Sequence, residues 1–348
     1  MLTEEANIAV VGAGAIGGVT AAFIEQAGYG LELVCKHAAL VDKITGEGLK
    51  ITGIRGDHSV KMRAVATIRE LSGPKDLVFL ATKANDCVAA AQALIPFLKP
   101  ESAVVSLQNG ISEHALADVL GKDRVIGCVV GWGASHDTPG QLEVTSEGEF
   151  VIGNPDGRPD DRLAFVQQVL NRVNPTRISI NIMGELYAKL IINACINSLG
   201  VIGGARLGRL LADKRARTIF IRLIAEDMAV ARAMNIQVEP AAGGKLDYHR
   251  FLRDGMCAGI RRHLILRLIG FKYRRIKSSS LQSIERGRRS EIDFLNGYVC
   301  ENGRTHGVPT PVNDAVRQMV HEIEAGRTTM SMDNLDRLMA VKGPSTTP

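Results

Sequence analysis

Three polar side chains recur at a spacing of four within one strongly apolar stretch of the chain. They are Lys189, Asn193 and Asn197, in the run from 186 to 199. In a helix each step of four residues advances by about 40°, so the three side chains form one narrow stripe. A buried ammonium and two buried carboxamides cost free energy unless they are hydrogen-bonded. The stripe is therefore either a polar seam bonded to a neighbouring helix, or a pocket wall that offers a small polar ligand a proton donor and two amides.

A glycine motif near the amino terminus favours the pocket. The motif Gly12-Ala-Gly14-Ala-Ile-Gly17 follows an expected strand at 8–11 and opens an expected helix at 16–27. Gly12 permits a tight turn, Gly14 lets the backbone approach a pyrophosphate, and Gly17 allows close packing of helix on strand. The phosphates would then meet the amino terminus of the helix. We therefore expect a dinucleotide to bind at Gly12, Ala13, Gly14, Ala15, Ile16 and Gly17.

The end of the second expected strand, at 31–34, bears on which dinucleotide binds. An acidic residue there would bind the ribose 2′-hydroxyl of NAD. This chain instead has Lys36 beside His37, and the nearby acid, Glu32, lies inside the strand. A cation suits the 2′-phosphate of NADP, so the pattern predicts NADPH as the cofactor. The alternative is that Lys36 is a solvent-exposed lysine without a role in binding.

Two further polar residues follow strands at positions where open α/β sheets bind ligands. Lys83 follows the expected strand at 76–81, and Asn109 follows the one at 103–107. Each is a candidate cofactor-binding residue, or else a loop residue that satisfies the local backbone.

The order of the expected strands and helices predicts an α/β chain of two domains. At 348 residues the chain exceeds the size at which a single core usually stops growing. Apolar, β-branched runs alternate with helical segments up to about 153, which predicts a Rossmann-type, doubly wound parallel sheet with helices on both faces. After 184 only helical patterns occur, and they include expected helices at 206–234 and 243–269. We expect an NADP-binding domain at 1–180, an all-α substrate and catalytic domain at 181–340, and a disordered tail at 341–348.

The composition is that of a soluble globular protein, with 45% hydrophobic and 23% charged residues. No run of eighteen apolar residues and no basic leader occurs, which argues against a membrane partner or secretion. The six cysteines are scattered without a CxxC pair, so neither a disulfide framework nor a metal site is indicated. A cytoplasmic location fits best.

Basic residues crowd the stretch from 261 to 289, although the net charge is only +5. Such a run could bind nucleic acid. Leucine and isoleucine interleave with it at helical spacing, however, as at Leu264, Leu266 and Leu268. A solvated helix face, or attraction of an anionic substrate and cofactor, is therefore favoured over a nucleic-acid partner.

With these motifs in place, the chain resembles the ketopantoate reductase (2-dehydropantoate 2-reductase) family over residues 7 to about 325. The resemblance is carried by the glycine motif, Gln108-Asn-Gly110, the Lys189-x3-Asn193-x3-Asn197 stripe, and two later segments. Those segments, 278–283 and 290–297, look like the family's SSMxQD and TEIDxxNG.

The resemblance implies NADPH-dependent reduction of 2-dehydropantoate to pantoate, in coenzyme A biosynthesis. Lys189 would be the general acid that protonates the carbonyl oxygen as hydride reaches the adjacent carbon. Asn193 and Asn197 would contact the hydroxyl and carboxylate end of the substrate, and Ser279 its carboxylate. Glu291 would bind substrate or orient the lysine near the cofactor, and Asn109 would hold the lysine and the nicotinamide region. A homodimer is a further expectation from the resemblance.

The chain also departs from the family pattern. Ser280 and Ser283 replace a methionine and an aspartate, Tyr187 stands where tryptophan is frequent, and Leu207 lies where a further asparagine is expected. The helical domain carries a basic extension at about 255–277. Two alternatives therefore stay open: reduction of another branched 2-keto acid, and a non-catalytic NADP(H)-binding sensor.

Overall fold

The computed structural model describes residues 5–244 and 246–342. The chain divides into two compact units, and the division falls between Leu186 and Tyr187, inside helix α6 (Ile182–Gly203). Each unit is described by itself. The expected tail at 341–348 lies mostly outside the described residues, since the description ends at Lys342.

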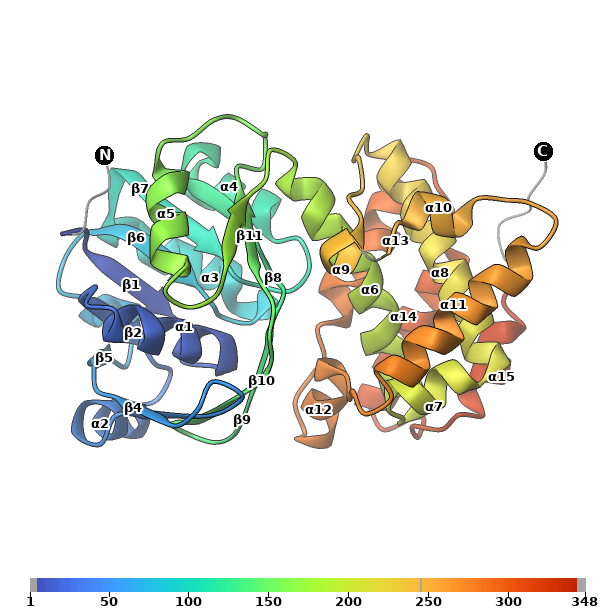
Figure 1. Cartoon of the computed structure of the whole chain (residues 1–348), viewed down its shortest axis with the longest axis horizontal. Coiled ribbons are helices and arrows are strands. Elements are labelled where there is room, and N and C mark those ends of the chain that lie inside the picture. The colour runs from blue at the N-terminus through green and yellow to red at the C-terminus, as the bar shows by residue number, and fades with distance from the viewer. Residues whose placement is uncertain (1–4, 245, 343–348) are drawn as a thin grey trace. The chain divides into compact units, whose positions relative to one another are not determined.

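The first unit is built on an eight-stranded sheet in the order β12-β11-β8-β7-β6-β1-β2-β5 (Figure 1). Its strands are β1 (Ile8–Val11), β2 (Leu31–Val34), β5 (Arg63–Val65), β6 (Lys75–Leu80), β7 (Leu98–Ser106), β8 (Val125–Val130), β11 (Phe150–Gly153) and β12 (Thr176–Ile178). Neighbouring strands are parallel, with one correction to the expectation: β11 runs antiparallel to β8. The sheet is therefore mixed.

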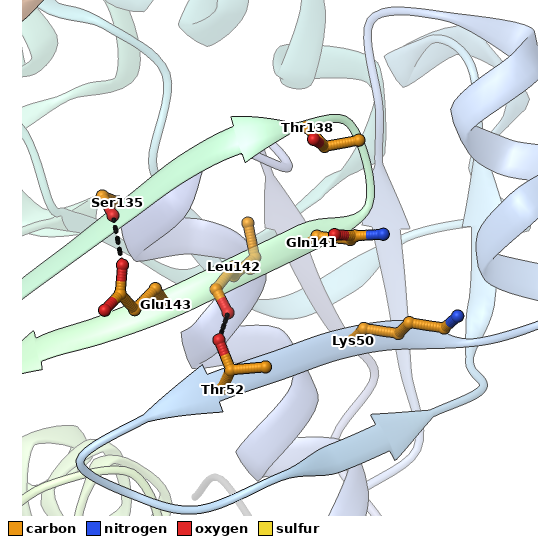
Figure 2. A pocket seen from close by; sticks show the side chains of 7 residues that line it. All are labelled: Lys50, Thr52, Ser135, Thr138, Gln141, Leu142 and Glu143. Atoms are coloured by element: carbon orange, nitrogen blue, oxygen red, sulfur yellow. Dashed lines mark hydrogen bonds between the residues drawn. The ribbon is translucent and has the colours of Figure 1, made fainter.

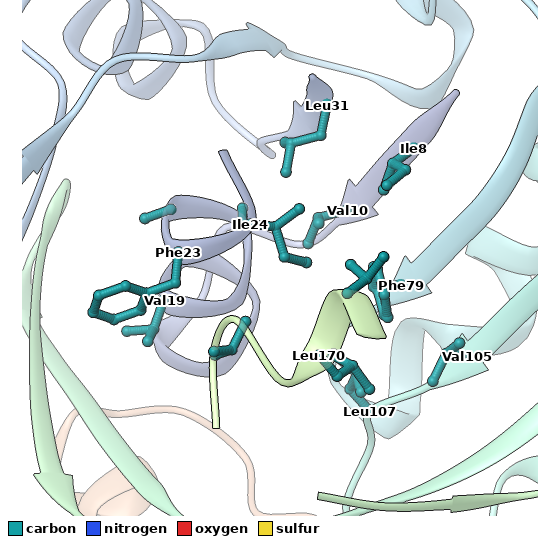
Figure 3. Close-up of a cluster of buried hydrophobic side chains, with 14 of the residues drawn as sticks. Ile8, Val10, Val19, Phe23, Ile24, Leu31, Phe79, Val105, Leu107 and Leu170 are labelled. Carbon is teal, nitrogen blue, oxygen red and sulfur yellow. The ribbon is translucent and has the colours of Figure 1, made fainter. Parts of the chain in front are cut away.

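Helices cover both faces of this sheet, as the alternating pattern predicted. They are α1 (Ala15–Gln26), α2 (Ala38–Gly46), α3 (Ala84–Leu94), α4 (Glu113–Leu120) and α5 (Arg162–Leu170), with short 3₁₀ turns η1 (Ile68–Glu70), η2 (Ile95–Phe97) and η3 (Lys122–Arg124). Successive strand residues point to opposite faces. Val10 belongs to one buried cluster with Ile24 of α1 and Leu170 of α5, as Figure 3 shows. Val11 packs with Ala91 of α3 and Leu116 of α4.

A second, four-stranded sheet was not predicted from the sequence. Its order is β4-β3-β10-β9, from β3 (Leu49–Gly53), β4 (His58–Val60), β9 (Gly133–Thr138) and β10 (Gln141–Ser146). Strands β3 and β10 alternate buried and exposed residues, so they lack the continuous apolar runs by which the larger sheet is recognised. The sheet packs against α1, where a Cβ on Gly18 would lie 2.6 Å from Cδ1 of Leu142.

The second unit is helical in the residues that the structure describes, apart from one isolated bridge between Ala241 and Leu246. After α6 come α7 (Leu207–Ala212), α8 (Lys214–Ala233), α9 (Ala241–Gly244), α10 (Tyr248–Leu252), α11 (Ala258–Lys272), α12 (Ser279–Glu285), η4 (Ile292–Phe294), α13 (Asn296–Thr305), α14 (Pro311–Glu324) and α15 (Asn334–Met339). The confirmed fold class is a Rossmann-type domain followed by a helical domain.

Several expected helices are interrupted. The expected helix at 206–234 breaks at Asp213, whose side chain accepts a hydrogen bond from the backbone N–H of Arg215 and caps α8. The expected helix at 243–269 is three helices, and Asp247 caps α10 in the same manner through Arg250. Aspartate is a favourable N-cap because its carboxylate satisfies a free N–H of the first helical turn.

Helix α6 is long and apolar enough to cross a membrane by length and composition alone. In the structure, 78% of its most apolar window is buried. Burial inside the protein accounts for its composition, so α6 is a core helix.

Candidate active site

The glycine turn after β1 has the geometry that its sequence predicted. Gly12 adopts a φ of 115°, which side-chain-bearing residues rarely adopt. Its N–H donates a hydrogen bond of 3.0 Å to the carbonyl of Val34, and a Cβ there would lie 2.8 Å from the carbonyl carbon of Ala81. Gly17 is also confined, because its Cβ would lie 2.7 Å from Cβ of Ala81.

Gly14 differs from these two glycines because it faces open space. Apart from Gly14 itself and its two chain neighbours, no atom of the described residues lies within 4 Å of the place where its Cβ would be. Gly14 is the N-cap of α1. Because glycine has no side chain, the first N–H groups of that helix receive no side-chain capping hydrogen bond from it. A free helix amino terminus beside open space is suited to a phosphate group. Ala13, Ala15 and Ile16 complete the turn.

Three other candidate residues come to the same edge of the sheet. Strands β7, β6, β1 and β2 are neighbours and run parallel, so their carboxyl ends lie together. Asn109 follows β7, Lys83 follows β6, the glycine turn follows β1, and Lys36 follows β2. Lys83 and Lys36 are exposed and Asn109 is half-buried. The first unit thus brings its candidate residues to one edge of the sheet.

Lys36 lies 3.6 Å from a carboxylate oxygen of Asp86, in the first turn of α3, and both side chains are exposed. Glu32, the acid inside β2, is already engaged: it accepts hydrogen bonds from Ser72 and pairs with Lys75 at 3.3 Å. Burial alone would raise the pKa of Glu32, but the Ser72 hydrogen bonds and the Lys75 charge outweigh it and lower that pKa. Glu32 is therefore a structural acid, bound within the fold.

Gln108 is a positioning residue beside Asn109. Its Nε2 donates hydrogen bonds to the carbonyls of Leu80 at 2.9 Å and Thr82 at 3.2 Å, and its Oε1 accepts one of 2.8 Å from Ser106. These bonds tie the loop after β7 to the loop after β6. The sequence motif included Gln108, but its spacing gave no sign of this cross-loop role.

In the second unit, the polar stripe lies on α6 as expected. Lys189 and Asn193 are half-buried and Asn197 is buried, while Leu190 and Ala194 between them are fully buried. A half-buried lysine on a mostly apolar helix combines access to a ligand with partial exclusion of water.

Two tyrosines hold α6 immediately before Lys189. Tyr187 donates a hydrogen bond of 3.0 Å to the backbone carbonyl of Asp227, and Tyr248 donates one of 2.7 Å to the carbonyl of Ala188. Both rings are buried, and burial raises the pKa of each phenol well above its ordinary value, with Asp227 contributing. Both therefore stay protonated and act as donors. Tyr187 thus has a structural role where tryptophan is frequent in the family pattern.

The structure brings Asn197 and Ser279 together. The hydroxyl of Ser279, the first residue of α12, lies 3.4 Å from Oδ1 of Asn197. Gly200, on the next turn of α6, makes the approach possible, since a Cβ there would lie 2.5 Å from Oγ of Ser278. Ser278 in turn caps α12 by accepting a hydrogen bond from Leu281. The role of Gly200 could not be read from the sequence, because its partner lies on another helix.

Glu291 is half-buried and precedes η4. The backbone beside it is fixed by Glu324, which accepts hydrogen bonds of 2.7 Å from both N–H and Oγ of Ser290.

A buried acidic pair beneath α14 was not predicted. Glu226 accepts hydrogen bonds of 2.9 Å from the backbone N–H groups of Val312 and Asn313, and Asn313 Nδ2 also donates to Asp227 at 3.0 Å. Burial raises the pKa of Asp227 well above its ordinary value, and the neighbouring charge of Glu226 adds to this. Burial therefore favours the protonated form of Asp227.

A polar pocket lies on the second sheet of the first unit. Figure 2 shows its lining, which is Lys50, Thr52, Ser135, Thr138, Gln141, Leu142 and Glu143. None of the predicted site residues belongs to this lining. Within residues 5–244 and 246–342, no group of three or more His, Cys, Asp or Glu side chains is placed to hold a metal ion.

A Rossmann-type unit with an open glycine turn, followed by a helical unit with a polar stripe, is the arrangement expected of a nicotinamide-dependent oxidoreductase. The family models for the N-terminal and C-terminal parts of "Ketopantoate reductase PanE/ApbA" match residues 8–157 and 181–324. The chain belongs to the ketopantoate reductase PanE/ApbA family.

Individual relatives agree with this membership. The chain is similar to 2-dehydropantoate 2-reductase of Mesorhizobium japonicum, at 27% identity over 92% of this chain and 98% of the relative. A crystal structure of a PanE/ApbA family ketopantoate reductase from Ralstonia eutropha matches with a TM-score of 0.79 at 29% identity, over 92% and 99% of the two chains. A D-mandelate dehydrogenase, solved with NADH and anilino(oxo)acetate, matches with a TM-score of 0.77 at 23% identity, over 95% and 99%. At that identity the likeness concerns the fold alone.

Proposed function

We propose that this protein catalyses the NADPH-dependent reduction of 2-dehydropantoate to pantoate. The observation that carries the proposal is the arrangement on α6, where Lys189 shares a stripe with Asn193 and with Asn197, which Ser279 contacts. One proton donor beside several neutral hydrogen-bonding groups suits a small, anionic hydroxy-keto acid. Family membership supports the same substrate class.

Bound NADPH would supply a hydride to the keto carbon of the substrate. The hydride brings both electrons of the new C–H bond. Negative charge then builds on the carbonyl oxygen. The ammonium of Lys189 stabilises this charge and donates the proton that completes the hydroxyl group. Asn193, Asn197 and Ser279 hold the hydroxyl and carboxylate groups of the substrate, and Glu291 binds substrate or orients the lysine.

We also propose that the first unit prefers NADPH over NADH. The open turn at Gly14 provides for the pyrophosphate, together with Ala13, Ala15 and Ile16. Lys36 provides a cation after β2, while Glu32 is occupied by Ser72 and Lys75. Lys83 and Asn109 would contact the cofactor from the neighbouring strand ends. In this proposal residues 1–180 bind the cofactor and residues 181–340 carry the substrate and catalytic groups.

A panel assay tests the proposal. NADPH oxidation is followed at 340 nm with 2-dehydropantoate, other branched 2-keto acids and benzoylformate, and NADH is compared under the same conditions. We expect the highest kcat/KM with 2-dehydropantoate and NADPH. A higher value with another branched 2-keto acid would favour the alternative reductase, as the replacements at Ser280 and Ser283 allow. Cofactor binding without turnover of any substrate would favour a sensor.

Retention of the Lys189 stripe, with its contact to Ser279, supports catalysis over sensing, since a sensor has no need of a proton donor. A cytoplasmic location and a homodimer accompany the proposal. Sedimentation velocity with and without NADPH tests the dimer.

A further inference from the structure

Helix α11 has one face packed and the opposite face exposed, and both are apolar. On the packed side, Ala258, Leu266 and Gly270 face α7 and α8, and Figure 1 shows α11 lying across these helices. The approach at Gly270 is close, because a Cβ there would lie 2.5 Å from Cβ of Leu211. Helix α11 is therefore packed closely against α7 and α8 within the second unit.

The outward face carries four large apolar side chains. Ile260, Leu264, Leu268 and Phe271 are 73%, 55%, 60% and 73% exposed. Their steps of four, four and three residues keep them in one line along the helix. We call these four residues the α11 ridge. The sequence favoured a solvated helix face here, but an exposed line of this kind typically marks an interaction site.

The surroundings of the ridge carry one sign of charge. From Gly255 to Ile284 the chain has no Asp or Glu, but it has seven Lys and Arg residues. Arg261 and Arg262 are engaged with backbone carbonyls of 250–253, and Arg262 also with Asp254. Four other cations flank or follow the ridge at exposed positions: Arg267, Lys272, Arg274 and Arg275. Lys277 is half-buried and pairs with Glu285.

A groove beside the ridge is also basic. It lies along α8 and α11, and its lining includes Lys214, Arg217, His263 and Arg267 next to Ile260 and Leu264. Burial and the charges of Arg217 and Lys214 lower the pKa of His263. The groove therefore holds a concentrated positive field next to exposed apolar side chains.

We propose that the α11 ridge docks on the surface of an anionic lipid bilayer. The four apolar side chains would enter the boundary between headgroups and acyl chains, and the flanking arginines and lysines would meet lipid phosphates. Amphipathic helices that lie in the membrane interface have this combination of an apolar face and Lys/Arg-rich flanks. This binding would be peripheral, and it is independent of the proposed reductase activity.

The charge pattern favours a bilayer over two other binding partners of the α11 ridge, namely a second copy of this chain and an acidic protein. A two-fold contact between α11 helices of two copies would bring two acid-free, basic segments together, which like-charge repulsion opposes. An acidic protein would need an apolar groove to receive the convex ridge. A bilayer meets neither obstacle. It adapts to a convex surface, and an anionic bilayer presents only negative charge to the basic segment.

Co-sedimentation of the full chain with vesicles tests the proposal. Phosphatidylcholine vesicles are compared with vesicles of phosphatidylcholine and phosphatidylglycerol at 70:30. We expect binding only to the anionic vesicles. Phe271→Glu should abolish it, and Arg267→Glu should weaken it by about fivefold or more, because each cation near an anionic surface contributes roughly that factor.

Matched controls are Ile54→Glu, a half-exposed isoleucine of the first unit, and Arg327→Glu, an exposed arginine outside the basic segment. Both should bind vesicles like the wild type. All variants should retain NADPH oxidation and unfolding temperature, which shows that they fold. Absence of wild-type binding to anionic vesicles would overturn the proposal, as would binding that Phe271→Glu leaves unchanged. A dimer that Phe271→Glu converts to monomer, without vesicle binding, would assign the ridge to a second copy instead.

Discussion

The hydroxyl of Ser279 donates a hydrogen bond of 3.4 Å to Oδ1 of Asn197, although 82 residues separate them. The bond joins the amino terminus of α12 to the polar stripe of α6. It leaves Nδ2 of Asn197 as a donor and the hydroxyl oxygen of Ser279 as an acceptor. Two residues that the sequence assigned separately to substrate binding are thus one unit, and their substitutions should not act independently.

Ser279→Ala should raise KM for the 2-keto acid more than it lowers kcat. The substitution removes a hydrogen bond to a charged carboxylate, which corresponds to a loss of roughly 10- to 100-fold in kcat/KM. Ser279→Thr keeps the hydroxyl and should restore most of the affinity. Steady-state kinetics of both variants check this, and an unchanged KM in Ser279→Ala would remove Ser279 from the site.

Lys189→Ala should fold and bind NADPH, but its kcat should fall by roughly 10²- to 10⁴-fold, as expected for loss of a general acid. Calorimetric binding of NADPH and single-turnover kinetics measure the two effects separately. Lys189→Met, which keeps the volume of the side chain, serves if the alanine variant is unstable.

Tyr187→Phe is the control for a purely structural effect on α6, since it removes only the hydrogen bond to the Asp227 carbonyl. It should lower stability by about 1 kcal/mol and leave turnover within a few-fold of wild type. If both lysine variants turned over at the wild-type rate, Lys189 would be part of a polar seam and not the proton donor.

Lys36→Asp should weaken NADPH binding by about 1–3 kcal/mol and change NADH binding little, because the substitution replaces a cation with a like charge beside the 2′-phosphate. Asp86→Asn is the informative partner. It removes the carboxylate that lies 3.6 Å from Lys36, so it should strengthen NADPH binding modestly. Titration with both cofactors measures each change, and a wild type that prefers NADH would refute the assignment.

Gly200→Ala should lower stability and raise KM together. The new Cβ would lie 2.5 Å from Oγ of Ser278 and would displace α12, which carries Ser279. Gly259→Ala is the control, since it is also helical but has open space around its Cβ position. It should be neutral or stabilising by up to about 1 kcal/mol. Equal effects of the two substitutions on KM would contradict the positioning role of Gly200.

Asp227→Asn should flatten the pH dependence of stability above about pH 4. The folded-state pKa of Asp227 lies above the unfolded value, so between the two values the folded state holds the extra proton. Stability from this group is complete below the unfolded pKa and falls as pH rises, by at most about 1.4 kcal/mol per pH unit. The neutral variant escapes this loss and should be no less stable than wild type near pH 8.

Asp293→Asn should change the pH dependence with the opposite sign. Hydrogen bonds and charge from Arg317 and His321 outweigh burial and lower the pKa of Asp293. Its contribution is therefore present above the unfolded pKa and is lost as pH falls. Urea unfolding from pH 3.5 to 8 distinguishes the two variants, and equal slopes for both would contradict the opposite pKa shifts of Asp227 and Asp293.

The sequence by itself determined what local patterns specify. The φ of Gly12 and the close packing at Gly17 follow from a glycine motif that no other residues could form. The strands of the larger sheet follow from continuous apolar runs, and the α6 stripe follows from helical periodicity. Each of these features depends on residues within a few positions of one another, so its cause is visible in the chain.

Tertiary structure decided the features that join distant segments. The second sheet pairs β3 with β10, and the strands on their own carry only a weak alternation. The contact of Ser279 with Asn197 and the raised pKa of Asp227 beside Glu226 exist only where separate helices meet. Likewise, Leu266 is buried and Leu264 exposed on one helix because α7 and α8 cover a single face of it. Periodicity shows which residues share a face, but packing partners decide which face is covered.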